Sequence, residues 1–148
     1  MPDSIDIRDD FDELLRTVHP AAGNSGLRGA SMPGAELTAA QLAGVDLEGA
    51  DLYWSILFRA NLSGARLRKV DLRGADLKEA NLQGTDLEGA RLGRDNLGGP
   101  TSLQGADLTG AVLRHADLKG ATYDARTRFP DGFSPERAAM VRVDVKQA

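Results

Sequence analysis

A five-residue repeat runs from Ser25 to Ala125 and constrains the fold of this chain more than any other feature. Its clearest stretch, residues 70–89, reads VDLRG ADLKE ANLQG TDLEG. The central residue is Leu in eighteen of the twenty repeats, with Met32 and Tyr123 in the other two. The residue two places earlier is Ala in thirteen repeats, and Gly closes twelve. A fixed period over two thirds of a chain is typical of stacked repeats that each contact only their neighbours.

A period of five suits neither an ordinary helix nor an ordinary strand, whose inward residues recur every 3.6 and every 2 residues. Within each repeat, however, the small residue and the Leu are two apart and therefore point to the same side. The chain must turn before the next repeat to keep both inside, and the closing Gly tolerates such a corner. The pattern therefore predicts a chain that turns every five residues and stacks its turns at about 4.8 Å, the spacing of paired strands.

The pattern Ala-(Asp/Asn)-Leu-x-x, as in Ala75-Asp76-Leu77 and Ala80-Asn81-Leu82, resembles the pentapeptide-repeat protein family. This resemblance implies an all-β solenoid, a right-handed quadrilateral β-helix with four repeats in each coil and about five coils. We expect three segments: an N-terminal helical cap at 1–24, the β-helix at 25–125 and a C-terminal capping segment at 126–148.

One interruption breaks the register of the repeat. The sequence DNLGG is followed by Pro100, and the pattern resumes at Thr101. We interpret this as a one-residue insertion at Pro100, with Leu97 still in a central position. Asp95 falls in the small-residue position just before it, where an unpaired buried carboxylate would be costly. We therefore expect Asp95 to accept hydrogen bonds from backbone N–H groups near Gly98–Thr101.

The segment before the repeat has a helical spacing of apolar residues. An amphipathic helix is predicted here, with Asp6 as its N-cap, lying over the first coil. The residues that define its apolar stripe are Ile7, Phe11, Leu14, Leu15 and Val18.

The segment after the repeat resembles the closing segment of many family members, with Phe129-Pro130 and Gly132-Phe133 as its marks. A short helix is predicted from Pro135 to Met140, because Pro suits a first helical turn. The alternation of Val141, Val143 and Val145 predicts a strand. The resemblance further implies a homodimer through the C-terminal end.

Four apolar side chains occupy outward positions that elsewhere hold charged, small or polar residues. They are Tyr53, Trp54, Ile56 and Phe58, and they include the only Trp. Exposed apolar patches with Trp and Tyr mark protein interfaces, so these four are the candidate partner-binding residues. The alternative is that a terminal segment folds over them, and the sequence leaves both open.

The sequence offers no set of residues for catalysis. It has no Cys, and its two His residues, His19 and His115, lack companions at metal-ligand spacing. No nucleophile, base and orienting group can be assembled, so we expect no enzyme activity, cofactor or metal. Eighteen basic against 22 acidic residues argue against direct nucleic-acid binding. An acidic N-terminus and the lack of a long apolar run lead us to expect a cytoplasmic protein without a membrane span.

Two functions fit these observations. The first is a non-enzymatic protein–protein interaction module on a rigid rod, with an unknown partner. The alternative comes from the resemblance, because some family members mimic DNA, bind DNA gyrase or related topoisomerases and confer fluoroquinolone protection. A DNA mimic should carry a continuous acidic strip, whereas the repeat region has 13 acidic and 11 basic residues.

Overall fold

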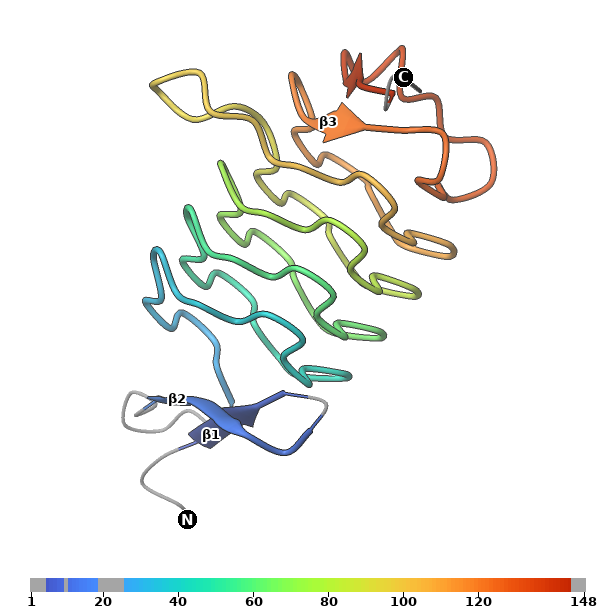
Figure 1. The fold of residues 1–148 in the computed structure, drawn as a ribbon. Coiled ribbons are helices and arrows are strands. Elements are labelled where there is room, and N and C mark those ends of the chain that lie inside the picture. The colour runs from blue at the N-terminus through green and yellow to red at the C-terminus, as the bar shows by residue number, and fades with distance from the viewer. Residues whose placement is uncertain (1–4, 10, 19–25, 145–148) are drawn as a thin grey trace.

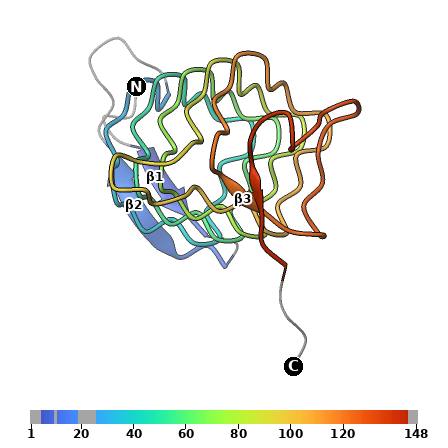
Figure 2. The same ribbon diagram turned by 90° about the horizontal axis from the view of Figure 1, so that it is seen from above.

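The computed structural model describes residues 5–9, 11–18 and 26–144, and it shows a rod of stacked coils (Figure 1). Viewed from above, the coils lie on one another around a common axis (Figure 2). Parallel bridges join residues 20 apart, such as Ser31 with Asp51 and Asp51 with Asp71. Since each repeat has five residues, four repeats complete one coil, and the predicted β-helical solenoid is confirmed.

The rod has four faces, which we number in the order the chain meets them. Their central residues are Leu27, Leu47, Leu67, Leu87 and Leu113 on face 1; Met32, Leu52, Leu72, Leu92 and Leu118 on face 2; Leu37, Leu57, Leu77, Leu103 and Tyr123 on face 3; and Leu42, Leu62, Leu82, Leu108 and Phe129 on face 4. Nearly all of these side chains are buried in one continuous core, which they form together with the small residues.

Two local bonds explain why the repeat turns where it does. At the regular corners the carbonyl of the central residue accepts from the N–H three residues later, as Leu52 does from Ser55 at 3.0 Å. The closing residue has positive φ, 72° at Gly74, as in a type II turn, so Gly is favoured there. The Asp or Asn before the Leu accepts from the backbone N–H two residues on, as Asp51 Oδ1 does from Tyr53 at 3.0 Å.

The interruption is larger than the sequence indicated, and the predicted one-residue insertion at Pro100 is wrong. Bridged residues are 26 apart across it, as in Asp76 and Ser102, whereas the other bridges join residues 20 apart, or 21 apart for Asp107 and Arg128. The whole repeat Asp95–Gly99 leaves the coil together with Pro100 and forms a six-residue loop, the yellow loop in Figure 1. Leu97 is 89% exposed on this loop rather than buried. An Asp in the small-residue position cannot be placed unpaired in an apolar core, so this repeat is extruded.

The predicted N-terminal helix is also wrong, because the segment forms an antiparallel hairpin. Strand β1 (Ile5–Arg8) pairs with β2 (Leu14–Val18), with Ile5 opposite Val18. β-Branched residues favour strands, and the open end of a solenoid offers backbone groups to pair with. The N–H of Gln41 donates to the carbonyl of Arg8 at 2.7 Å, and Ile7 is buried. The segment therefore caps the first coil as a hairpin; residues 1–4, 10 and 19–25 lie outside the described part.

At the other end, strand β3 (Thr122–Tyr123) pairs in parallel with β4 (Val141–Arg142), so the predicted strand at Val141 is confirmed; Val145 lies outside the described residues. The predicted helix at Pro135–Met140 is not formed, and residues 135–139 make successive turns. So short a segment gains few hydrogen bonds for the cost of helix nucleation. Phe129 stacks on Phe133 with ring centres 5.2 Å apart and closes the fifth coil, as expected of this segment.

Candidate interaction surface

The four candidate partner-binding residues lie along face 3 of the second coil. Tyr53 and Trp54 form the corner between faces 2 and 3, Ile56 lies on face 3, and Phe58 lies at the corner between faces 3 and 4. Trp54 is 47% exposed and Ile56 39% exposed, while Tyr53 and Phe58 are half-buried. We call these four residues the aromatic patch. Ile56 bridges Glu36 below and Asp76 above, so charged residues border the patch along face 3.

Trp54 occupies a corner position where Gly is usual. Its φ is 59°, a left-handed conformation that is a genuine outlier for a bulky residue. Other non-Gly closing residues, such as Lys69 and Glu79, share this conformation, so it belongs to the corner and not to Trp54 alone. The conformation aims the indole along the rod axis toward the next corner.

The indole fits there because two neighbours lack a side chain. A Cβ on Gly74 would lie 3.0 Å from the indole Nε1, and one on Gly99 would lie 2.9 Å from Cζ2. Gly74 is the corresponding corner of the third coil, and Gly99 belongs to the extruded loop. Trp54 is therefore held between the coil and the loop with about half of its surface free.

Asp95 organises the extruded loop from its base, as predicted. Its Oδ1 accepts from the N–H of Leu97 at 2.8 Å and of Gly99 at 2.6 Å. Burial works to raise the pKa of Asp95, but these two N–H groups and the side chains of Trp54 and Tyr53 outweigh it and lower the pKa. Within the described residues, the other carboxylate oxygen, Oδ2, is buried and makes no hydrogen bond.

Thr101 closes the loop from the other side. Its hydroxyl accepts from the N–H of Gly74 at 3.2 Å and lies 2.9 Å from the carbonyl of Leu72 and 3.1 Å from that of Gly93. In the coil below, the equivalent N–H of Trp54 reaches the carbonyl of Arg73 directly, at 3.0 Å. The hydroxyl thus replaces a backbone bond that the loop interrupts.

Arginine side chains flank the aromatic patch. The guanidinium of Arg73 lies 5.5 Å from the centre of the Tyr53 ring and makes a two-point contact with Asp71, at 2.9 and 2.8 Å. Burial acts to raise the pKa of Asp71, but the hydrogen bonds and the charge of Arg73 outweigh this effect, so the pKa is lowered. Tyr53 and Trp54 meet edge to face, with ring centres 6.3 Å apart. These contacts hold Tyr53 in one orientation beside Trp54.

Leu97 is the residue beside this surface that the sequence reasoning missed. The repeat pattern predicts Leu97 in the core, whereas in the structure it lies on the loop that contacts Trp54. The signal was present, because Asp95 in a small-residue position precedes an extra residue. Taken together, these two departures indicate an excluded repeat.

Polar residues elsewhere in the described part of the chain are the possible metal ligands. Within the described ranges, no three residues among His, Cys, Asp and Glu lie close enough to hold a metal ion. Nor do those ranges contain a helix long and apolar enough to cross a bilayer. His115 is exposed, and His19 lies outside the described residues.

Comparison with known families settles the class of the chain. The model of pentapeptide repeats matches in eight copies at residues 26–57, 55–94 and 101–122. The chain belongs to the pentapeptide-repeat family. The matched ranges pass over residues 95–100, which are those that leave the coil.

Several solved structures resemble this pentapeptide-repeat protein, whereas a search of curated proteins found no match. The protein alr5209 from Nostoc PCC 7120 is 39% identical, over 76% of this chain and 84% of that one, with a TM-score of 0.45. HetL from the same cyanobacterium, involved in heterocyst differentiation regulation, is 32% identical over 78% and 55% (TM-score 0.33). QnrB1, a plasmid-mediated fluoroquinolone resistance protein, is 19% identical over 80% and 62% (TM-score 0.29).

Proposed function

We propose that this pentapeptide-repeat protein is a non-enzymatic protein–protein interaction module that binds its partner through the aromatic patch. The observation that carries the proposal is Trp54, which is held against Gly74 and Gly99 and leaves about half of its surface free. Trp and Tyr are the commonest anchors of protein interfaces. A rigid solenoid presents them at little entropic cost on binding.

The experiment replaces Trp54 with Gly. Because Gly is the usual residue at these corners, Trp54→Gly should keep the fold while removing the anchor. A matched control is Lys69→Gly, since Lys69 is also a non-Gly corner residue with φ of 55°, but on face 1. In affinity capture from cell extract with quantitative mass spectrometry, we expect specific partners to be lost with Trp54→Gly and kept with Lys69→Gly. The same partners at the same yield in both variants would reject the aromatic patch.

The charge pattern of the rod does not favour the DNA-mimic alternative. On face 1 the acids of one coil pair with arginines of neighbouring coils, as Glu48 does with Arg28 at 3.5 Å and Glu88 with Arg68 at 3.3 Å. Positive and negative coils alternate along this face. A partner that reads a line of phosphates would meet a repulsive group at every second coil.

A further inference from the structure

The extruded loop carries an exposed apolar residue on the segment that contacts the aromatic patch. Gly99 of this loop lies against the indole of Trp54, where a Cβ at Gly99 would be 2.9 Å from Cζ2. Two residues earlier, Leu97 is 89% exposed. Its N–H donates to Asp95 Oδ1 at 2.8 Å, so Leu97 is held on an ordered turn. Leu97 and Trp54 are therefore exposed apolar side chains on two segments that contact each other.

Basic side chains border this apolar surface on face 2. The guanidinium of Arg73 lies 5.5 Å from the centre of the Tyr53 ring. Arg91, one coil above, is exposed, and its Nη1 lies 3.9 Å from Oδ2 of Asp71. Arg73 already binds the same oxygen at 2.8 Å. Two guanidinium groups thus share one carboxylate, and a net positive charge remains.

Arg94 places a further positive charge at the extruded loop. Its Nη1 donates to the carbonyl of Gly98 at 3.3 Å, one residue after Leu97. Its side chain passes over Gly120, where a Cβ would collide with it. Among the residues that the structure describes, Arg94 makes no ion pair. Its charge is therefore not balanced by a neighbouring acid.

Face 2 from the third coil upward differs in charge from the chain as a whole. It carries four basic and two acidic residues, whereas the chain has 18 basic and 22 acidic ones. The six residues are Asp71, Arg73, Arg91, Arg94, Asp117 and Lys119. The carboxylate of Asp95, at the base of the loop, is buried, and its Oδ1 is occupied by two N–H groups. The charges on this side of the aromatic patch therefore favour an acidic ligand.

We propose that the partner binds through an acidic segment that carries one large apolar side chain. This inference rests on the proposed function, because it names the chemistry of the partner that the aromatic patch would bind. The apolar side chain packs against Trp54 and Leu97, and the acidic groups continue along face 2 to Arg91 and Arg94. Leu97 thus becomes a second anchor of the interface, contributed by the repeat that has left the coil.

Acidic residues on face 3 set the direction of such a segment. Glu36 and Asp76 border Ile56 below and above. They repel a run of acids, so the segment is directed from the corner at Trp54 onto face 2 rather than onto face 3.

A peptide fits this surface better than a nucleic acid does. The net charge of the chain is −4, which repels a long polyanion. Single-stranded nucleic acids are held by aromatic side chains on which successive bases stack. Here two of the exposed apolar residues, Leu97 and Ile56, are aliphatic.

The first experiment selects peptides from a random phage-displayed library on the immobilised full-length protein. We expect the enriched peptides to be rich in Asp and Glu around one large apolar residue. Trp54→Gly should abolish their binding, as the proposed function requires. Trp54-dependent peptides that are not acidic, or no enrichment at all, would overturn the acidic segment without contradicting the aromatic patch. Peptides that bind Trp54→Gly as well as wild type would contradict both.

Charge reversal tests the basic side chains with a synthetic peptide copied from the most enriched sequence. In fluorescence anisotropy, the double variant Arg91→Glu/Arg94→Glu should raise the Kd of this peptide by roughly tenfold or more. The matched control Arg66→Glu/Lys69→Glu changes the net charge equally, at the same two positions of a face 1 repeat, and should bind nearly as wild type. Arg91→Glu alone serves if loss of the Arg94 contact with the loop prevents folding. Equal effects of the face 2 and face 1 variants would overturn the proposal.

The second anchor and the class of ligand are tested with the same peptide. Leu97→Ala should raise the Kd by roughly tenfold, whereas Val112→Ala, which shortens an exposed apolar side chain on face 1, should not change it. An unaffected Leu97→Ala would exclude the loop from the interface. A single-stranded DNA oligonucleotide is the second probe. If it binds more tightly than the peptide, and binding is lost in Arg91→Glu/Arg94→Glu, the basic side chains serve nucleic acid and the proposal is wrong.

Discussion

The hydroxyl of Thr101 shows how much one atom contributes where the repeat is interrupted. The side chain is fully buried and links the N–H of Gly74 to the carbonyl of Gly93. Thr101→Val keeps the shape and removes the hydroxyl, so it leaves the partly buried N–H of Gly74 without an acceptor. We expect the free energy of unfolding to fall by roughly 1–3 kcal/mol in urea denaturation. The exposed Thr109→Val should change it little, and an equal effect of both would show that the bridge is unimportant.

Two leucines at the same position of the repeat pattern should differ strongly in how much stability is lost on substitution by Ala. Leu77 is fully buried, so Leu77→Ala should cost roughly 2–5 kcal/mol of stability through lost burial and a residual cavity. Leu97→Ala should be nearly neutral because Leu97 lies on the extruded loop. Thermal and urea unfolding of the two variants measure the difference. A large loss of stability with Leu97→Ala would place that residue in the core and contradict the six-residue loop.

At this scale the sequence was a good guide wherever the repeat was regular. The inward Leu and Ala residues and the Asp side chains that bind the backbone at corners follow from the period alone. The prediction failed at Asp95 because two different arrangements give the same spacing in the sequence. In one, a single residue is inserted at a corner; in the other, a whole repeat and Pro100 leave the coil together. Only the burial cost of the carboxylate separates the two readings.

Among the elements, the extruded loop should respond to pH. The pKa of Asp95 is lowered in the fold, and so is that of Asp71 on face 2, which means that the folded state holds their protons less tightly than the unfolded chain. Their contribution is therefore complete above the ordinary Asp pKa of about 3.9 and is lost as the pH falls below it. We expect stability to begin to fall near pH 5 and to continue falling at lower pH.

Urea denaturation between pH 6 and pH 3 measures this dependence, and Asp95→Asn is the informative variant. Asn keeps an acceptor for the two loop N–H groups and cannot ionise, so its pH dependence should be flatter than that of the wild type. Superimposable curves for the two proteins would mean that Asp95 does not contribute to it.

The hairpin illustrates why an element at the end of a solenoid is hard to predict locally. The spacing of Ile7, Phe11 and Leu14 satisfies a helix, but the residues of β1 also alternate in burial around Ile7, as in a strand. The neighbouring coil favours the strand, because the N–H of Gln41 needs an acceptor and the carbonyl of Arg8 provides one in the extended conformation. That partner is 33 residues away and invisible to any local pattern.

For the molecule as a whole, the balance of charge bears on the gyrase alternative. Purified protein titrated into a gyrase supercoiling assay, with and without a fluoroquinolone, should have no effect, because arginines interrupt the acidic residues along face 1. Supercoiling by gyrase alone and drug-inhibited gyrase are the reference reactions. Dose-dependent inhibition, or protection from the drug, would instead assign the chain to the DNA mimics.

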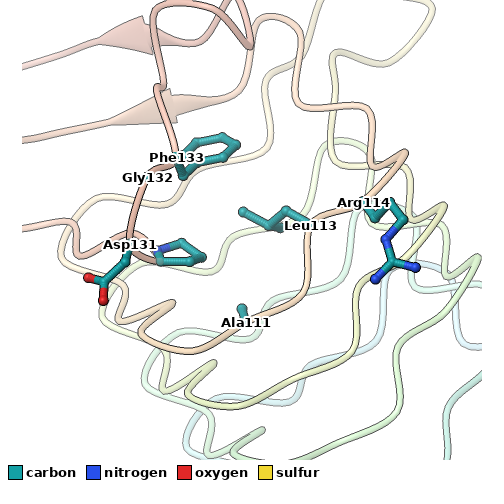
Figure 3. A pocket seen from close by; sticks show the side chains of 7 residues that line it. Ala111, Leu113, Arg114, Asp131, Gly132 and Phe133 are labelled. Carbon is teal, nitrogen blue, oxygen red and sulfur yellow. The ribbon is translucent and has the colours of Figure 1, made fainter.

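The placement of the aromatic patch along one face follows from the period of the repeat, which puts Tyr53 and Trp54 at the corner before Ile56 and Phe58 at the corner after it. What holds Trp54 could not be predicted, because Gly74 is 20 residues away and Gly99 reaches the indole only after its repeat has left the coil. The open hollow lined by Leu113 and Phe133 near the C-terminal end (Figure 3) depends in the same way on how far the C-terminal segment extends over the last coil.

The extruded repeat has a consequence for every residue that follows it. Since four repeats complete a circuit, the gain or loss of one repeat keeps each Leu inside yet moves everything downstream by a quarter of the circumference. Relative to an uninterrupted count, all residues from Thr101 to Tyr123 stand one face earlier. The gain or loss of a whole repeat therefore leaves the packing of Leu and Ala in the core unchanged. It does change which outward side chains are neighbours along each face of the rod.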